Sequence, residues 1–166
     1  MYITTYTSPL GPITLACDGD KLTGLWLEGQ KYYGAGLLQN AQEKDSAPIF
    51  TAAKSWLNRY FGGENPNAFE LPLSPAGSEF RQGVWALLRE IPYGEVVTYG
   101  DIAKKMAAKM SRKSMSGQAV GGAVGHNPIS IIIPCHRVVG SNGSLTGYAG
   151  GVAAKAQLLK LEGACV

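Results

Sequence analysis

Short runs of apolar, aromatic and β-branched residues mark the first part of the chain. They cover residues 2–8, 13–18 and 22–28, and they are separated by Ser8-Pro-Leu-Gly-Pro12 and by Asp18-Gly-Asp20. Runs of this length, bounded by Gly, Pro and Asp, predict β-strands joined by tight turns. We therefore expect a small antiparallel sheet, followed by a polar loop over 31–47.

Helical patterns dominate the rest of the sequence. We expect helices over 47–61, from a cap at Ser78 to Ile91, from Thr98 or Tyr99 past Met106, from about Ser116 to Gly125, and over 152–162. The first places Ala53, Trp56, Leu57 and Tyr60 on one face, the spacing of an amphipathic helix. Ser78 is followed by Arg81 rather than by the Glu that would complete a capping box.

The order of these elements predicts an α+β protein of two domains, 1–75 and 76–166. Residues 65–75 contain three prolines and are the best candidate for a linker. Three short helices, a buried strand at 131–133 and a Gly/Ser loop over 139–151 resemble a winged helix-turn-helix module.

The helix expected from Ser116 to Gly125 is unusually rich in small residues. Gly121, Gly122 and Gly125 lie within it or at its end, together with Ala119 and Ala123. Each interior glycine costs a helix about 1 kcal/mol. Either another helix packs closely against this one, or a partner approaches its backbone.

Composition narrows the class of protein. The chain has 166 residues, of which 45% are hydrophobic and 16% charged, which fits a globular protein rather than a disordered one. Apolar runs are too short for a membrane helix, and the N-terminus does not resemble a signal peptide. We expect a cytoplasmic protein that does not associate with membranes.

Charge is unevenly distributed along the chain. Residues 1–75 hold five basic and seven acidic residues, a net charge of −2, whereas residues 76–166 hold ten basic and five acidic residues, a net charge of +5. A basic C-terminal part indicates either an anionic partner or ordinary solvated surface.

The three cysteines, Cys17, Cys135 and Cys165, give no disulfide framework and fit a reducing compartment. The two histidines, His126 and His136, do not complete a zinc pattern with them. We expect no metal site. Cys17 lies in an alternating apolar stretch and is expected to be a buried thiol.

Cys135 differs because His136 follows it directly and Pro134 precedes it. An imidazole close to a thiol can promote thiolate formation. Neighbours in a strand point to opposite faces, so the two cooperate only if Pro134 turns the chain or a water bridges them. Glu162 is the best acidic candidate to orient the imidazole. The alternatives are a core cysteine beside an incidental histidine and a surface carboxylate.

Several motifs together resemble the 6-O-alkylguanine-DNA alkyltransferase family, also called methylated-DNA–protein-cysteine methyltransferases. They are Phe80-Arg-Gln-Gly-Val-Trp85, Ile91-Pro-Tyr-Gly94, Thr98-Tyr99, Ala119-Val-Gly-Gly-Ala123, Asn127-Pro128, Pro134-Cys-His-Arg-Val138, Gly147-Tyr148 and Leu159-Lys-Leu-Glu-Gly163. The resemblance is strong over about residues 76–163. It implies a ribonuclease-H-like N-terminal domain and a helix-turn-helix C-terminal domain.

The resemblance implies a single-turnover reaction without a cofactor. An alkyl group moves irreversibly from 6-O-alkylguanine in duplex DNA to Cys135; whether 4-O-methylthymine is also a substrate stays open. By similarity, His136 takes the thiol proton through a water, and Glu162 orients the imidazole. Tyr99 matches a hydrogen-bond donor to the purine ring. Asn127 matches an asparagine that ties the small-residue helix to the active-site strand.

The resemblance also assigns binding residues. The alkylguanine pocket corresponds to Val124, Val138, Gly147, Tyr148 and Ala149. The base must leave the duplex to reach a thiol. The small-residue helix would lie in the minor groove through Ala119, Gly121 and Gly122, and Arg112 and Lys113 are candidate phosphate contacts.

One position departs from the family pattern. Gln118 stands where the family usually has an arginine that fills the space left by the flipped base. Glutamine can hydrogen-bond there but lacks the charge and the stacking plane. The loop over 107–116 is also longer than in the family, so an alignment with Arg112 in this role stays open.

Two other classes of function stay open at this stage. Alkyltransferase-like proteins bind alkylated DNA without the cysteine, and the presence of Cys135 argues against that class. A cysteine hydrolase using Cys135 and His136 is disfavoured by their adjacency and by the DNA-binding layout. We expect a monomeric bacterial protein whose partner is double-stranded DNA.

Overall fold

The structure is a computed structural model that describes residues 1–36, 38–145 and 147–164. The chain forms two compact units. Unit 1 comprises Met1–Ala76 and Pro128–Ile132, and unit 2 comprises Gly77–Asn127 and Ile133–Val166. The chain therefore leaves unit 2 after Asn127 and returns to it at Ile133, just before Cys135.

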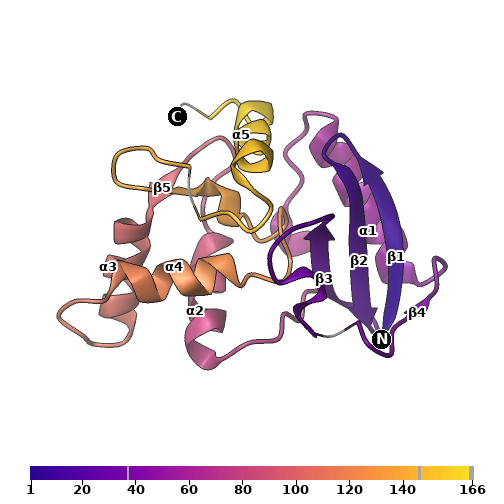
Figure 1. Ribbon diagram of the computed structural model, residues 1–166, viewed down its shortest axis with the longest axis horizontal. Coiled ribbons are helices and arrows are strands. Elements are labelled where there is room, and N and C mark those ends of the chain that lie inside the picture. The colour runs from indigo at the N-terminus through magenta and orange to yellow at the C-terminus, as the bar shows by residue number, and fades with distance from the viewer. Residues whose placement is uncertain (37, 146, 165–166) are drawn as a thin grey trace. The chain divides into compact units, whose positions relative to one another are not determined.

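Unit 1 is built on the sheet that these short runs predict (Figure 1). Strands β1 (Tyr2–Ser8), β2 (Gly11–Asp18) and β3 (Lys21–Leu27) pair antiparallel. The expected polar loop contains the short 3-10 helix η1 (Tyr33–Gly36) and a two-residue strand, β4 (Gln42–Glu43), which pairs parallel to β1. The strand order is β3-β2-β1-β4.

Helix α1 (Pro48–Phe61) packs against β1, β2 and β3. Its apolar face buries Phe50, Ala53, Trp56, Leu57 and Tyr60 against the strands. Proline occupies its first position, where the missing N–H has no intrahelical partner to lose. Cys17 is fully buried in β2, as the sequence predicts.

The proline-rich stretch over 65–75 is not a free linker, and that prediction was wrong. It contains the 3-10 helix η2 (Ala68–Glu70), and its next residues bond to β3. The Leu22 amide donates to the Pro72 carbonyl at 2.9 Å, and the Ser74 amide donates to the Leu22 carbonyl at 2.8 Å. Proline lacks an N–H but keeps its carbonyl acceptor, and burial of Leu71 anchors the segment.

The buried strand predicted over 131–133 is absent, which corrects a second expectation. Ile131 has a φ of 72°, and the Ile132 amide bonds to the Ser130 carbonyl at 2.8 Å, so the chain turns here. The residues just before this segment contact β3 instead, since the Leu25 amide donates to the Pro128 carbonyl at 2.8 Å and the Ser130 amide donates to the Leu25 carbonyl at 3.1 Å. The three isoleucines are buried. Their preference for strands reflects burial, which a turn can also provide, and it does not require pairing with a second strand.

Unit 2 contains four helices at the places the sequence indicates. They are α2 (Glu79–Leu88), α3 (Tyr99–Lys109), α4 (Gly117–Gly125) and α5 (Val152–Leu161). Ser78, Thr98 and Ser116 cap the first three, and Thr98 forms a complete capping box with Asp101. Helix α4 packs against α2 and α3, and the Trp85 indole donates to the Ala123 carbonyl at 2.8 Å.

Two short strands join the segments that flank the site. Strand β5 (Val97–Thr98) pairs parallel with β6 (Val138–Val139), which follows the 3-10 helix η3 (Cys135–Arg137). In the described part of 140–151 there is no strand, so the predicted wing is a loop with a tight turn at Gly140–Ser144. Among the described residues, none of the helices is long and apolar enough to cross a membrane.

Candidate active site

Cys135 lies at the first position of η3, in a turn rather than in a strand. Pro134 precedes it with a ψ of 64°, and the Cys135 amide bonds back to the Ile133 carbonyl at 2.8 Å. In a strand, the side chains of Cys135 and His136 would point to opposite faces. Because the two residues lie in a turn, this constraint does not apply to them. Cys135 is 4% exposed and His136 is fully buried.

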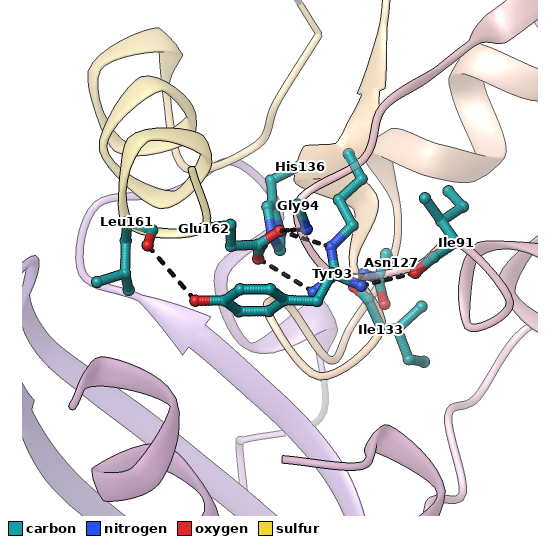
Figure 2. Close-up of polar contacts among 9 residues, drawn as sticks. Ile91, Tyr93, Gly94, Asn127, Ile133, His136, Leu161 and Glu162 are labelled. Carbon is teal, nitrogen blue, oxygen red and sulfur yellow. Dashed lines mark hydrogen bonds and ion pairs between the residues drawn. The ribbon is translucent and has the colours of Figure 1, made fainter. Parts of the chain in front are cut away.

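His136 and Glu162 form a buried pair, as Figure 2 shows. The Nε2 atom of His136 lies 2.6 Å from Oε2 of Glu162, and both side chains are fully buried. Glu162 is the C-cap residue of α5, so the end of that helix carries the carboxylate to the imidazole. A bond from Nε2–H to the carboxylate leaves Nδ1 as the acceptor nitrogen of a neutral ring.

Arg137 also holds the Glu162 carboxylate, which the sequence did not indicate. Its Nε donates to Oε1 at 2.8 Å, its Nη2 donates to Oε2 at 3.1 Å, and its Nη1 donates to the Ile91 carbonyl at 2.7 Å. The Gly94 amide adds a bond to Oε1 at 3.3 Å. A planar guanidinium suits such a two-oxygen contact. In the sequence, Arg137 is distinguished only by its position next to His136, and that position does not show that its side chain is buried.

These contacts fix the charges of the pair. Burial alone would raise the pKa of Glu162, but hydrogen bonds from His136 and Arg137 outweigh it and hold the pKa at about 2. Burial lowers the pKa of His136, and the bond to Glu162 opposes this only in part. Glu162 is therefore an anion beside a neutral imidazole at neutral pH.

The Cys135 thiol is protonated in the unbound protein. Burial raises its pKa to about 11, against the lowering effects of a hydrogen bond from Asn127 and of the Lys155 charge. A thiol with this pKa is not a free thiolate at neutral pH. Any reaction at Cys135 therefore needs its proton to be removed as the new bond forms.

Lys155 is a second buried cation that the sequence did not single out. It is fully buried, its Nζ donates to the Val138 carbonyl, and it lies 5.8 Å from the centre of the Tyr99 ring. Burial lowers its pKa to about 8. The sequence could have predicted this burial. Lys155 lies three residues before Leu158 and four before Leu159, so it shares their apolar face of the helix.

Asn127 and Tyr99 frame the same region. The Asn127 side-chain amide donates to the Ile133 carbonyl at 2.9 Å, which ties the end of α4 to the segment before Cys135. Tyr99 begins α3, and burial raises the pKa of its hydroxyl. A Cβ atom at Gly147 would lie 2.6 Å from that hydroxyl, so the loop passes close to Tyr99 only because residue 147 is glycine.

The other residues predicted to line a pocket differ in exposure. Val124, Val138 and Tyr148 are buried, and the Tyr148 ring lies 6.5 Å edge-on from His136. Ala149 is half-buried and Gly147 is exposed. Unit 2 thus places Tyr148 against the histidine and Gly147 against Tyr99.

Several small residues of α4 border open space, whereas Ala123 is buried. A Cβ atom added at Gly121 or Gly122 would meet nothing within 4 Å, and Gln118 and Ala119 are exposed. Close packing inside unit 2 therefore does not explain these two glycines, which leaves approach by an outside partner. Arg112 and Lys113 are exposed on the connection before this helix.

Comparison with known proteins gives a consistent result over the whole chain. Residues 1–75 match the ribonuclease-like domain of 6-O-methylguanine DNA methyltransferase, and residues 79–164 match its DNA-binding domain. A methylated-DNA–protein-cysteine methyltransferase of Methanosarcina acetivorans is 44% identical over 99% of this chain and 100% of that protein. One of Haemophilus influenzae is 41% identical over 98% of this chain and 86% of that protein.

Solved structures agree. The crystal structure of Mycobacterium tuberculosis OGT in complex with DNA superimposes with a TM-score of 0.86 at 42% identity, covering 98% of this chain and 93% of that chain. With sequence and fold in agreement, the chain belongs to the 6-O-methylguanine DNA methyltransferase family.

Proposed function

We propose that this protein repairs alkylated duplex DNA by moving the alkyl group from O6 of guanine to Cys135. One observation carries the assignment of residues: a buried thiol begins a turn whose next side chain is held by a buried carboxylate, His136 against Glu162. The activity itself is that of the family to which the chain belongs.

The transfer is a displacement at carbon. The Cys135 sulfur forms a bond to the alkyl carbon as the bond from that carbon to O6 breaks, and the electron pair leaves with the guanine. The thiol proton passes to Nδ1 of His136, directly or through a water, and Glu162 stabilises the imidazolium that results. The thioether is stable, so each molecule reacts once.

The leaving guanine, which takes the electron pair of the broken bond, is stabilised by a hydrogen bond to its ring. We assign Tyr99 as the hydrogen-bond donor to the purine ring, because its hydroxyl borders the loop at Gly147 and burial raises its pKa, which keeps it protonated. Lys155, beside the Tyr99 ring, places a positive charge near the thiolate that forms. Val124, Val138, Tyr148 and Ala149 are proposed to surround the base.

Helix α4 is proposed to contact the minor groove. The open space beside Gly121 and Gly122 allows a sugar–phosphate backbone to approach the helix backbone. The target base leaves the stack to reach Cys135, and Gln118 fills the gap without the charge of an arginine. We also propose that residues 76–166 carry DNA binding and chemistry, that residues 1–75 form a separate domain, and that the protein acts as a monomer.

The test is the mass of the intact protein after incubation with duplex DNA containing 6-O-methylguanine. We expect a gain of one methyl group on Cys135 and no gain in Cys135→Ala. Tight binding without an adduct would instead indicate a binding module, and turnover of an ester or peptide would indicate a hydrolase. A parallel incubation with a duplex containing 4-O-methylthymine tests whether this base is also a substrate.

A further inference from the structure

The motif Ile91-Pro-Tyr-Gly94 forms a turn that contains no residue proposed to touch the substrate, yet it contacts the buried carboxylate of Glu162, as Figure 2 shows. The Glu95 amide donates to the Pro92 carbonyl at 3.1 Å, which closes the turn. Gly94 has a φ of 81°, a conformation that glycine adopts without strain. The turn therefore brings a backbone amide to the carboxylate from a fixed direction.

Hydrogen-bond donors surround both oxygens of the Glu162 carboxylate. Oε2 accepts from Nε2 of His136 at 2.6 Å and from Nη2 of Arg137 at 3.1 Å. Oε1 accepts from Nε of Arg137 at 2.8 Å and from the Gly94 amide at 3.3 Å. A backbone amide cannot rotate away as a long side chain can, so it restricts the carboxylate with little further loss of conformational entropy.

The turn also lies close to the end of the helix that carries Glu162. A Cβ atom at Gly94 would lie 3.1 Å from the backbone carbonyl oxygen of Glu162, so residue 94 has little room for a side chain. The Tyr93 hydroxyl donates to the Leu161 carbonyl at 3.4 Å, at the end of α5, where carbonyls lack an intrahelical donor. The Tyr93 ring lies 5.7 Å from the Arg137 guanidinium. Tyr93 thus contacts both the helix end and the cation that neutralises the carboxylate.

We propose that Tyr93 and Gly94 are positioning residues for the reaction at Cys135. They hold the Glu162 carboxylate in the place where it fixes the tautomer of the His136 ring. The proposal rests on the proposed function, in which Nδ1 of His136 takes the thiol proton. Nδ1 can accept that proton only while Nε2 carries the ring hydrogen, and the bond from Nε2 to Oε2 selects this tautomer. If the carboxylate shifts, the hydrogen can occupy Nδ1 instead, and such a ring cannot take the proton.

The test compares Gly94→Ala with Gly143→Ala. Both glycines have a φ of 81°, but a Cβ atom at Gly143 would meet nothing within 4 Å, so the control has the same backbone strain without the contact. The ring nitrogens are observed by nitrogen NMR at neutral pH in the free protein, with His126, the other histidine of the chain, as the internal reference. We expect Gly94→Ala to move the Nδ1 signal of His136 toward that of a protonated nitrogen. Transfer to Cys135 should slow roughly tenfold, and the control should change neither measurement.

Tyr93→Phe is measured in the same way, because it removes only a hydroxyl and decides the question even if Gly94→Ala does not fold. It should slow transfer about twofold, the effect of one weak hydrogen bond. Its control is Tyr6→Phe, which removes a hydroxyl bonded to Asn58 at 2.7 Å in unit 1 and should leave the rate unchanged.

An Nδ1 signal that stays unchanged in the folded variants, or a loss of rate shared with the controls, overturns the proposal. The wild-type protein is scored separately with methylated DNA. Absence of an adduct there contradicts the proposed function, whereas a wild-type adduct with an unchanged Nδ1 signal in the variants contradicts only the positioning role.

Discussion

The interiors of the two units hold different kinds of groups. Unit 1 buries Trp26, Phe50, Leu57 and Tyr60, and its arginine–glutamate pair, Arg59 with Glu70, lies at the surface with 37% and 38% of the side chains exposed. Unit 2, in its described part, buries the charged or chargeable side chains of His136, Arg137, Lys155 and Glu162 as well as Cys135. Burying charges costs free energy unless each is paired. The difference indicates that unit 1 is arranged for stability, whereas unit 2 accepts that cost to hold reactive groups in place.

The strongest test of this contrast is Arg137→Gln. The change removes the guanidinium that neutralises the Glu162 carboxylate and leaves that carboxylate buried beside His136 and the Gly94 amide. We expect the free energy of unfolding, measured with urea, to fall by about 3 kcal/mol, the usual cost of removing one partner of a buried ion pair.

Arg137→Lys is the matched variant, because it keeps the charge but not the two-oxygen contact. It should recover part of the stability and, with it, part of the rate of transfer to Cys135. A loss below about 1 kcal/mol in Arg137→Gln would mean that this pair behaves like a surface pair.

Because Lys155 is buried, the free energy of unfolding should depend on pH. The folded pKa of Lys155, about 8, lies below the ordinary value of 10.5. Between these values the unfolded chain binds more protons, so stability rises with pH. Cys135 acts oppositely above pH 9, where its raised pKa of about 11 makes the fold lose stability. The measurement therefore uses the Cys135→Ala background.

In that background we expect the unfolding free energy to rise by about 2 kcal/mol from pH 8 to pH 10. Adding Lys155→Met should abolish the rise, and the difference between the two curves isolates this one group. A rise that persists without Lys155 would show that other groups cause it. It would contradict the prediction that burial lowers the pKa of Lys155.

Gly147 tests how tightly the site is positioned. Gly147→Ala puts a Cβ atom 2.6 Å from the Tyr99 hydroxyl, at a φ of 87°. Gly143→Ala is the matched control, because Gly143 has a φ of 81° and nothing lies within 4 Å of a Cβ atom there. Both should lose about 1 kcal/mol of stability from the left-handed backbone.

Only Gly147→Ala should also slow transfer to Cys135, by roughly tenfold, which corresponds to about 1.4 kcal/mol. The rate is followed as the appearance of the methylated protein by mass. Equal rates in the two alanine variants would show that Tyr99 shifts without consequence for the reaction.

The sequence predicted the elements of this fold better than their connections. Helical periodicity located α1 because one face of that helix is buried. The first three strands were located by apolar runs bounded by Gly, Pro and Asp, and β3 is buried at six successive residues. Ile131–Ile133 misled, since a buried turn and a buried strand use the same β-branched residues. In the site, His136 and Glu162 were singled out from the residues themselves, and the resemblance gave each of them a role. The ion pair of Arg137 with Glu162 and the burial of Lys155 were missed, because charged residues are expected at the surface and only the folded chain shows that these two are buried.

The smallest effect is expected at the ion pair of unit 1, which completes the comparison with Arg137. Arg59 and Glu70 are both well exposed, so water already solvates each charge and salt screens their attraction. Arg59→Gln should leave the urea midpoint unchanged within error, and it should leave the rate of transfer to Cys135 unchanged. A loss comparable to that of Arg137→Gln would mean that the η2 segment, which carries Glu70, depends on this pair rather than on the burial of Leu71. Leu71→Ala distinguishes the two, because it removes the apolar anchor and keeps the ion pair intact.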